Sequence, residues 1–170
     1  NDMLDLAKPE AMRTPKVLSD IDLTDLLEGD ALQFESVAFE RGIDLHMDIQ
    51  QGVHLKGDVM RLHRLTSTLI DNACKYANDN GSVQVQLRAD NREVRLTVHN
   101  TGTVIAPEDL PRVFDRFYRA DKARTRDSGS YGLGLAIARD VAREHGGDIT
   151  VASVEADGTT FTVELPRKTV

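Results

Sequence analysis

Three stretches of the chain place apolar residues three or four positions apart, which is the spacing of one face of an α-helix. The predicted helices cover residues 24–42, 58–77 and 133–145. Thr24 and Asp58 are residue types that cap helix N-termini, and we expect them to begin the first two helices. Gly42 can end the first helix, and Gly146 with Gly147 can end the third.

Other stretches alternate apolar and polar residues, which is typical of a half-buried β-strand. The expected strands cover residues 43–49, 83–87, 94–98, 149–151 and 161–165. Asn91 predicts a hairpin turn between the second and third strands, and Asp157–Gly158 predicts a turn between the last two. About three helices and five mostly antiparallel strands indicate an α+β fold. We expect a two-layer α/β sandwich, with the helices packed on one face of a mixed sheet.

Two stretches follow neither pattern. Residues 1–20 predict a helical remnant that is broken at Pro9 and Pro15. From Arg119 to Tyr131, apolar residues give way to charged residues, Ser and Gly, which predicts a mobile loop. We therefore divide the chain into a short N-terminal piece, 1–20, and one domain, 21–170.

The composition excludes several classes of protein. A length of 170 residues suits one domain. The 21 Lys and Arg residues face 28 Asp and Glu, and the net charge of -7 argues against nucleic-acid binding. The single cysteine, Cys74, excludes an internal disulfide and a zinc-finger site, and we expect it to be a small buried filler. No apolar run approaches the about 18 residues of a membrane span, and no signal-peptide pattern is present.

The second predicted helix ends in the motif Asp71–Tyr76. Asn72 interrupts the apolar face of this helix. Taken alone it fits a hydrogen-bonded buried amide, but its carbonyl oxygen would also suit Mg²⁺. Lys75 lies three residues later on nearly the same face. It fits either a solvated surface lysine or a cation that meets a phosphate.

Three further motifs are weak when taken singly. His99–Ile105 follows a strand, and Gly102 permits a tight turn there. Phe114–Arg119 contains three aromatic residues, which alone fit a small hydrophobic cluster under a loop. Gly129–Leu135 is a glycine-rich turn at the start of the third helix, where free backbone N–H groups and the helix dipole can bind an anion. It follows no strand and lacks a Gly-Lys-Ser/Thr ending, so it is neither a Rossmann nor a P-loop motif.

In their order and spacing, these four motifs resemble the N box, first glycine box, F box and second glycine box of one family. This is the catalytic, ATP-binding domain of sensor histidine kinases of two-component systems, in the superfamily that includes gyrase, heat-shock chaperone and mismatch-repair ATPases. The resemblance covers about residues 20–165, and Gly158–Phe161 matches a glycine-Thr element near its end. The aromatic block favours histidine kinases over the other branches. The resemblance implies a Bergerat-type ATP-binding fold.

The resemblance also implies roles for individual residues. Asn72 would bind Mg²⁺, and Lys75 and Arg119 would contact phosphate, so these three are the expected catalytic residues. Tyr76 would pack near the ribose, and Gly102 would approach the adenine. The expected ATP-binding set comprises Asn72, Lys75, Tyr76, Asn100, Gly102, Ile105, Phe117, Tyr118, Arg119, Gly129, Gly132, Leu133, Gly134, Leu135 and Thr160. Residues 119–131 would form a lid over ATP.

Three positions depart from the family pattern. Asn100 stands where the family usually has Asp. A hydrogen bond from the adenine amino group to this side chain would no longer be charge-assisted, which would cost about 1 kcal/mol of binding free energy. Val104 replaces the second glycine of the same motif, and Thr68 replaces the Asn or Glu that often lies one turn before Asn72. These changes predict lower affinity or activity and softer discrimination against guanine.

The phosphoacceptor histidine of the family is missing. Met12–Pro15 looks like the tail of its motif, but Glu10 occupies the histidine position, so we take the match as chance. Residues 1–20 would instead be the end of a dimerisation hairpin helix and a linker, followed by the catalytic domain, 21–170. The first residue is not Met, which also predicts a piece of a longer protein.

The resemblance implies a protein-histidine kinase fragment that binds Mg-ATP. It would transfer the γ-phosphoryl group to a histidine of its own dimerisation domain, for relay to an aspartate of a response regulator receiver domain. We expect a monomer that does not autophosphorylate alone and binds no nucleic acid. The full-length protein would be a homodimer, with this part as the cytoplasmic domain of an inner or plasma membrane sensor.

Three other functions remain open at this point. Thr68 and Asn100 favour a nucleotide-sensing domain with little or no phosphotransfer. A superfamily ATPase or a serine kinase of the anti-sigma type is opposed by the aromatic block in Phe114–Arg119. A protein-interaction domain without nucleotide would require the four motifs to coincide by chance.

Overall fold

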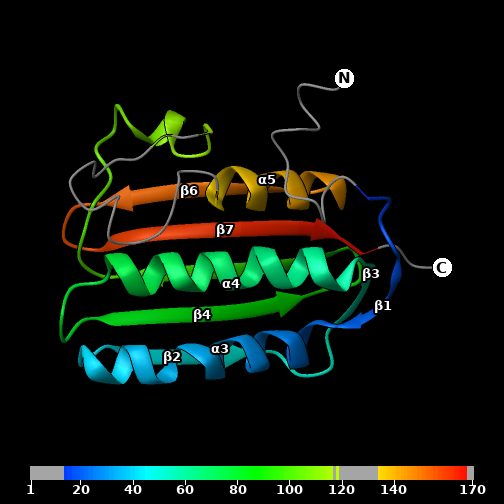
Figure 1. The fold of residues 1–170 in the computed structure, drawn as a ribbon, viewed down its shortest axis with the longest axis horizontal. Coiled ribbons are helices and arrows are strands. Elements are labelled where there is room, and N and C mark those ends of the chain that lie inside the picture. Colours follow the sequence, from blue (N-terminus) through cyan, green and yellow to red (C-terminus); the bar gives the residue numbers. More distant parts are fainter. Residues whose placement is uncertain (1–13, 117, 119–133, 168–170) are drawn as a thin grey trace.

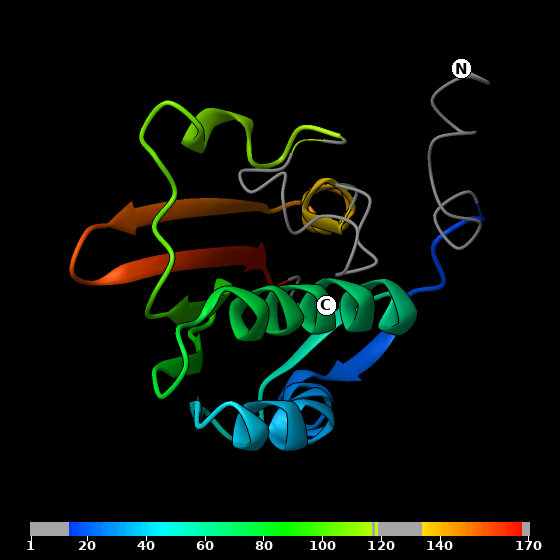
Figure 2. The ribbon, with the colours of Figure 1, turned by 60° about the vertical axis from the view of Figure 1, so that its left-hand side comes forward.

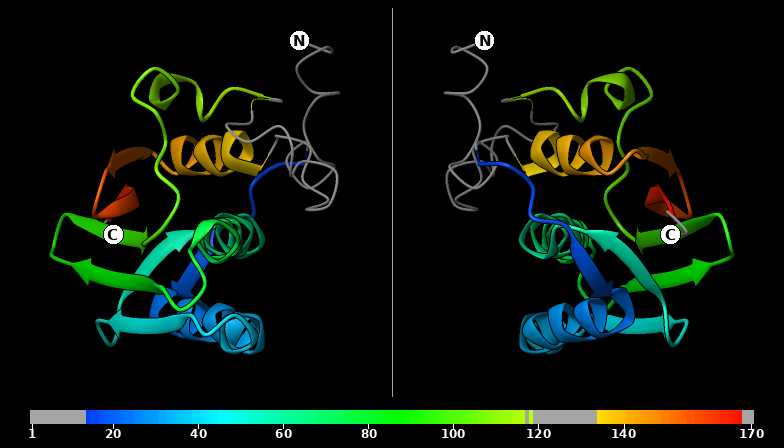
Figure 3. Two further views of the ribbon diagram at one scale, coloured as in Figure 1. Left: turned by 90° about the vertical axis from the view of Figure 1, so that its left-hand side faces the viewer. Right: turned by 90° about the vertical axis from the view of Figure 1, so that its right-hand side faces the viewer.

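A computed structural model describes residues 14–116, 118 and 134–167 of the chain, and the statements below refer to this part. It has two layers, a β-sheet and three α-helices that cover one face of it (Figure 1 and Figure 3). The helices, labelled as in Figure 1, are α3 (Leu23–Glu40), α4 (Val59–Tyr76) and α5 (Gly134–Glu144). This arrangement confirms the predicted two-layer α+β sandwich.

The main sheet has five strands in the order β2-β4-β5-β7-β6. The strands are β2 (Asp44–Ile49), β4 (Ser82–Ala89), β5 (Glu93–Asn100), β6 (Asp148–Val154) and β7 (Gly158–Pro166). β2 pairs with β4 in parallel, and the other neighbours are antiparallel. The predicted hairpins β4–β5 and β6–β7 are both present, so the mixed and mostly antiparallel sheet is confirmed.

A second, two-stranded sheet was not predicted. β1 (Ser19–Asp22) pairs antiparallel with β3 (His54–Gly57). The helical expectation for residues 1–20 is wrong at residues 14–20, none of which is helical, whereas residues 1–13 lie outside the described part. Each strand has four residues and buries one large apolar side chain, Ile21 in β1 and Leu55 in β3. Such short segments give no periodic pattern to detect.

The helix starts show which capping predictions hold. Asp58 caps α4 as expected, because its carboxylate accepts the backbone N–H of Arg61 at 3.2 Å. The cap of α3 is Asp22, and the prediction of Thr24 is wrong. The buried Thr24 hydroxyl instead donates to the Gln50 carbonyl at 2.7 Å. It thereby joins α3 to the turn after β2.

Helix α4 lies between α3 and α5 on the sheet (Figure 1 and Figure 2). Leu62, Leu65, Leu69 and Ile70 are at most 1% exposed and face the alternating apolar side chains of β4, β5 and β7. Burying an aliphatic side chain of this size contributes about 1.5–3 kcal/mol. The helix is therefore a firmly held support for the polar residues in its last two turns.

Different elements lie at the two ends of the layers. At the left-hand end of Figure 1 lie the end of α4, the β6–β7 turn and the yellow-green segment that follows β5. That segment crosses toward β6 and includes a short 3₁₀ helix, η1 (Leu110–Arg112), which contacts β6. The opposite end holds β1, β3 and the start of α4. No helix in the described part is long and apolar enough to cross a membrane.

Candidate functional site

The last turns of α4 present the first group of predicted site residues. Asn72, Lys75 and Tyr76 are all partly exposed there. The ammonium group of Lys75 forms an ion pair with the Asp71 carboxylate at 3.1 Å, one helical turn back. Cys74, beside them, is buried, and burial raises the pKa of its thiol to about 11. Cys74 is therefore a core residue as predicted, with too little thiolate near neutral pH to act as a nucleophile.

The loop after β5 packs directly on the end of α4. Gly102 has φ +103°, and a Cβ atom there would lie 2.5 Å from the backbone nitrogen of Asn78. Only glycine fits this position, because both the backbone conformation and the close approach exclude a side chain. The Thr103 N–H donates to the Tyr76 carbonyl at 3.3 Å. These contacts bring the motifs of residues 71–76 and 99–105 together.

Asn100 ends β5 and is only 2% exposed. Its side-chain NH₂ group donates to the Thr101 carbonyl at 2.9 Å, which fixes the orientation of the amide. The first residue of β7, Gly158, has φ +114°, and a Cβ atom there would lie 2.0 Å from the Asn100 carbonyl oxygen. The glycine-Thr element is thus built against the backbone of Asn100.

Sheet register separates the two threonines of that element. Thr159 is paired with Asn100, and Thr160 with His99. Because side chains alternate along a strand, Thr159 shares the helix-covered face with Asn100 and Phe161, whereas Thr160 points to the other face. The structure therefore does not bring Thr160 to the other site residues. Sequence reasoning missed Thr159, although its even spacing from the apolar Phe161 was a usable signal.

The start of α5 faces α4 one turn before Asn72. A Cβ atom at Gly134 would lie 3.3 Å from the Thr68 methyl group. The N-terminal end of α5, which carries the positive end of the helix dipole, therefore lies beside Thr68 of α4. Leu135 is partly buried against the core and holds this end of α5 in place. Such an arrangement suits an anion.

The segment after η1 is fixed to the sheet by Phe114. Its ring packs edge-to-face on Phe161 with centroids 6.0 Å apart, and the Arg139 guanidinium lies 4.8 Å from its centroid. Tyr118 lies under the Arg112 guanidinium, and burial together with a hydrogen bond to Asp109 raises the pKa of Tyr118 to about 12. It therefore stays a neutral phenol at physiological pH.

Five predicted site residues lie outside the described part of the chain. They are Phe117, Arg119, Gly129, Gly132 and Leu133. The whole of the expected lid, 119–131, also lies outside it. Their roles stay predictions. At one end of the layers, the described part brings together Asn72, Lys75, Tyr76, Asn100, Gly102 and Gly134. Ile105 lies further along the loop after β5, where its N–H donates to the Ser153 hydroxyl at 2.8 Å.

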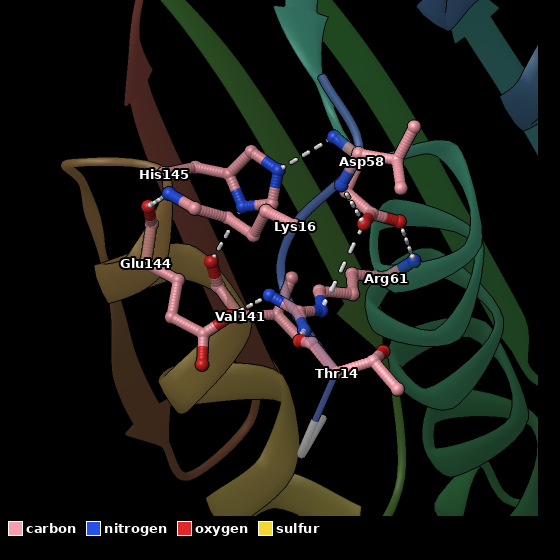
Figure 4. A network of polar contacts seen from close by, with 8 residues as sticks. Thr14, Lys16, Asp58, Arg61, Val141, Glu144 and His145 are labelled. Atoms are coloured by element: carbon pink, nitrogen blue, oxygen red, sulfur yellow. Dashed lines mark hydrogen bonds and ion pairs between the residues drawn. The ribbon is translucent and has the colours of Figure 1, made fainter. Parts of the chain in front are cut away.

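A separate polar network lies at the opposite end of the helices (Figure 4). The Arg61 guanidinium is 5% exposed, binds the Glu144 carboxylate at 2.8 Å and donates to the Thr14 carbonyl. Asp58 accepts the Val17 N–H at 2.9 Å. Burial opposes ionisation of Asp58, but the backbone donors and Arg61 outweigh it and lower its pKa. The network joins the segment before β1 to α4 and α5.

Comparison with known proteins agrees with this geometry. Residues 57–169 match the family described as histidine kinase-, DNA gyrase B- and HSP90-like ATPases, and the chain belongs to that family. A relative is the sensor histidine kinase RppB of Synechocystis sp., with 39% identity over 145 residues, 85% of this chain and 32% of that protein. The chain thus spans about a third of the length of this relative.

Two solved structures place the chain within the family. The catalytic domain of histidine kinase ThkA has a TM-score of 0.79 and 25% identity, and the match covers 89% of this chain and 98% of that one. Full-length ShkA, solved in complex with AMPPNP, has a TM-score of 0.80 and 27% identity, covering 100% of this chain and 35% of that one. The chain is accordingly an ATP-binding domain of the sensor histidine kinase type.

Proposed function

We propose that this chain binds Mg-ATP and transfers the γ-phosphoryl group to a histidine of a dimerisation domain, for relay to a response regulator aspartate. The main support is the convergence of three segments at one end of the layers: the end of α4, the loop after β5 and the start of α5. Phosphoryl transfer requires positioning and charge neutralisation more than covalent help from the protein. Each segment supplies one part of that requirement.

The adenine end of the proposed site is at Asn100. Its NH₂ group donates a hydrogen bond to the Thr101 carbonyl, so the side-chain oxygen is the group suited to accept the adenine amino N–H. Gly102 lets the backbone pass without a side chain in the way. Thr159 lies on the same face and can support this contact.

The phosphate end is between α4 and α5. The N–H groups at the start of α5 would bind phosphate oxygens, and Lys75 would exchange its ion pair with Asp71 for a phosphate. The described residues contain no cluster of three or more metal-binding side chains. The Asn72 amide oxygen fits an ion that arrives with the nucleotide and keeps phosphate and water ligands. Mg²⁺ held there would neutralise the charge on the phosphates.

The remaining parts of the proposal concern the whole protein. The receiving histidine would lie in a dimerisation domain connected through residues 1–20, and 21–170 would be the catalytic domain. The relatives are sensor histidine kinases, which supports a response regulator as the next phosphate acceptor. We infer that this domain works in the cytoplasm as part of a membrane-anchored homodimer.

Calorimetric titration with ATP tests the proposal. The domain should bind ATP with Mg²⁺ and more weakly without it. Asn72→Ala should weaken Mg-ATP binding about tenfold while binding without Mg²⁺ changes little, because the substitution removes a metal ligand. Asn91→Ala, the same change in the exposed β4–β5 turn, is the matched control and should bind like the wild type. Absence of binding at millimolar ATP would contradict the proposal.

The transfer step has its own readout. A separately purified dimerisation domain should gain phosphate from this chain plus Mg-ATP, and the chain alone should gain none. ATP binding without any such transfer would favour a nucleotide-sensing role instead.

A further inference from the structure

Two hydroxyl side chains lie beneath the loop after β5. Ser153 of β6 and Thr159 of β7 are paired across the β6–β7 hairpin, and their oxygens are 2.8 Å apart. We term them the hydroxyl pair. Thr159 is 3% exposed, and Ser153 belongs to none of the motifs that define the nucleotide site.

The hydrogen bonds of the hydroxyl pair run in one direction. The Thr159 hydroxyl donates its single proton to the Thr103 carbonyl at 3.1 Å, so the Ser153 hydroxyl must donate to Thr159. The Ser153 oxygen in turn accepts the Ile105 N–H at 2.8 Å. The chain of bonds thus starts and ends on the same loop, two residues apart, and fixes the backbone between them.

This loop needs such support. Thr103 and Val104 are exposed, and Gly102 at their N-terminal side is in a positive-φ conformation. The loop directly follows Asn100, the last residue of β5, which the register pairs with Thr159 of the hydroxyl pair. The position of the loop backbone next to Asn100 is therefore set by groups on β6 and β7.

We propose that Ser153 is a positioning residue for the base of the nucleotide. Through its hydrogen bonds with Thr159 and Ile105, Ser153 fixes the loop backbone next to Asn100, where the base would bind. Ser153 does not contact the nucleotide itself. This inference rests on the proposed ATP-binding function. A role confined to holding the β6–β7 hairpin together would affect folding but not the choice of ligand.

Ligands with and without a base separate the two roles. Calorimetry would compare Mg-ATP, ADP and inorganic tripolyphosphate on the wild type, Ser153→Ala and Ser153→Thr. We expect Ser153→Ala to bind ATP and ADP about three- to tenfold more weakly, because one hydrogen bond is lost on each side of the residue. Tripolyphosphate binding should not change. Ser153→Thr keeps the hydroxyl and should restore nucleotide binding.

Two controls complete the test. Thr150→Ala removes an exposed hydroxyl from the other face of the same strand and should leave all affinities unchanged. In NMR spectra, the Ile105 amide proton should move upfield in Ser153→Ala and return in Ser153→Thr. Equal nucleotide affinity of Ser153→Ala and wild type, or an equal loss for tripolyphosphate, would overturn this inference alone. Failure of the wild type to bind ATP would overturn the proposed function as well.

Discussion

At the scale of single residues, Asn100 combines burial with a neutral side chain. Its amide fits because the NH₂ group faces the Thr101 carbonyl, which repels a carboxylate oxygen. A carboxylate at this place would nevertheless accept a stronger, charge-assisted hydrogen bond from the adenine amino group. The same carboxylate would repel the carbonyl oxygen that guanine carries at that position.

Asn100→Asp should therefore make the free protein less stable and its binding more selective for ATP over GTP. We expect the ratio of ATP to GTP affinity to rise about tenfold, and the free protein to lose about 1–2 kcal/mol of unfolding free energy. Competition of each nucleotide against a fluorescent ATP analogue measures the ratio, and urea denaturation measures the stability. An unchanged ratio would show that Asn100 does not read the base.

The residue scale also shows what the sequence could and could not predict about the site. Asn72, Gly102 and Gly134 could be proposed from sequence because glycines and a polar residue on an apolar helix stand out there. Ser153 looks like an ordinary strand residue, and its pairing with Thr159 depends on the register of β6 with β7. Register is a property of strand pairing, which a pattern along one strand does not specify.

At the scale of elements, the long helices and the hairpins of the main sheet were predictable because their apolar periodicity extends over many residues. β1 and β3 were not predicted, because each spans only four residues and each depends on the other for its hydrogen bonds. The cap of α3 was misplaced by two residues because Asp22 and Thr24 are both good capping residues. The Thr24 hydroxyl instead donates to the Gln50 carbonyl, a contact that forms only in the folded chain.

The β6–β7 hairpin contains a strained turn that can be relieved. Ala156 has φ +77°, a conformation that costs a residue with a Cβ about 1–2 kcal/mol, whereas glycine adopts it freely. Ala156→Gly should therefore raise the unfolding free energy by about 0.5–1 kcal/mol, after the entropy lost by glycine is subtracted. Urea denaturation measures the change.

The matched control is Ala152→Gly in the exposed face of β6. Its backbone is an ordinary strand, so the same substitution should destabilise the protein by about 0.5–1 kcal/mol. If both variants lose stability equally, the turn at Ala156 is not strained.

At the scale of the whole molecule, α4 and α5 connect two distant regions. One end of each helix belongs to the proposed nucleotide site, and the other belongs to the network with the segment before β1 (Figure 4). His145, just after α5, accepts the Asp58 N–H at 3.0 Å through Nε2 and faces the Val141 carbonyl at 2.8 Å through Nδ1. These two bonds require the neutral ring with its proton on Nδ1.

Acidification should therefore loosen this end of the molecule. Burial lowers the pKa of His145 below its ordinary 6.5, so the unfolded chain takes up the proton more readily than the folded one. The stabilisation is complete above pH 6.5 and falls as the pH drops below it, until the folded protein also binds the proton. Lys16, Glu144 and Asp58 are the charged groups that face the ring. We expect a loss of about 1 kcal/mol, the value of the bond to the Asp58 N–H.

Urea denaturation at several pH values between 8 and 5 would measure this loss. His145→Gln has no titrating ring and should show a smaller fall in unfolding free energy over the same range. His46→Gln, which changes an exposed histidine of β2, should keep the wild-type slope. A parallel fall for wild type and His145→Gln would mean that another group titrates. A steeper wild-type curve would show that the junction between the N-terminal segment, α4 and α5 depends on a neutral His145.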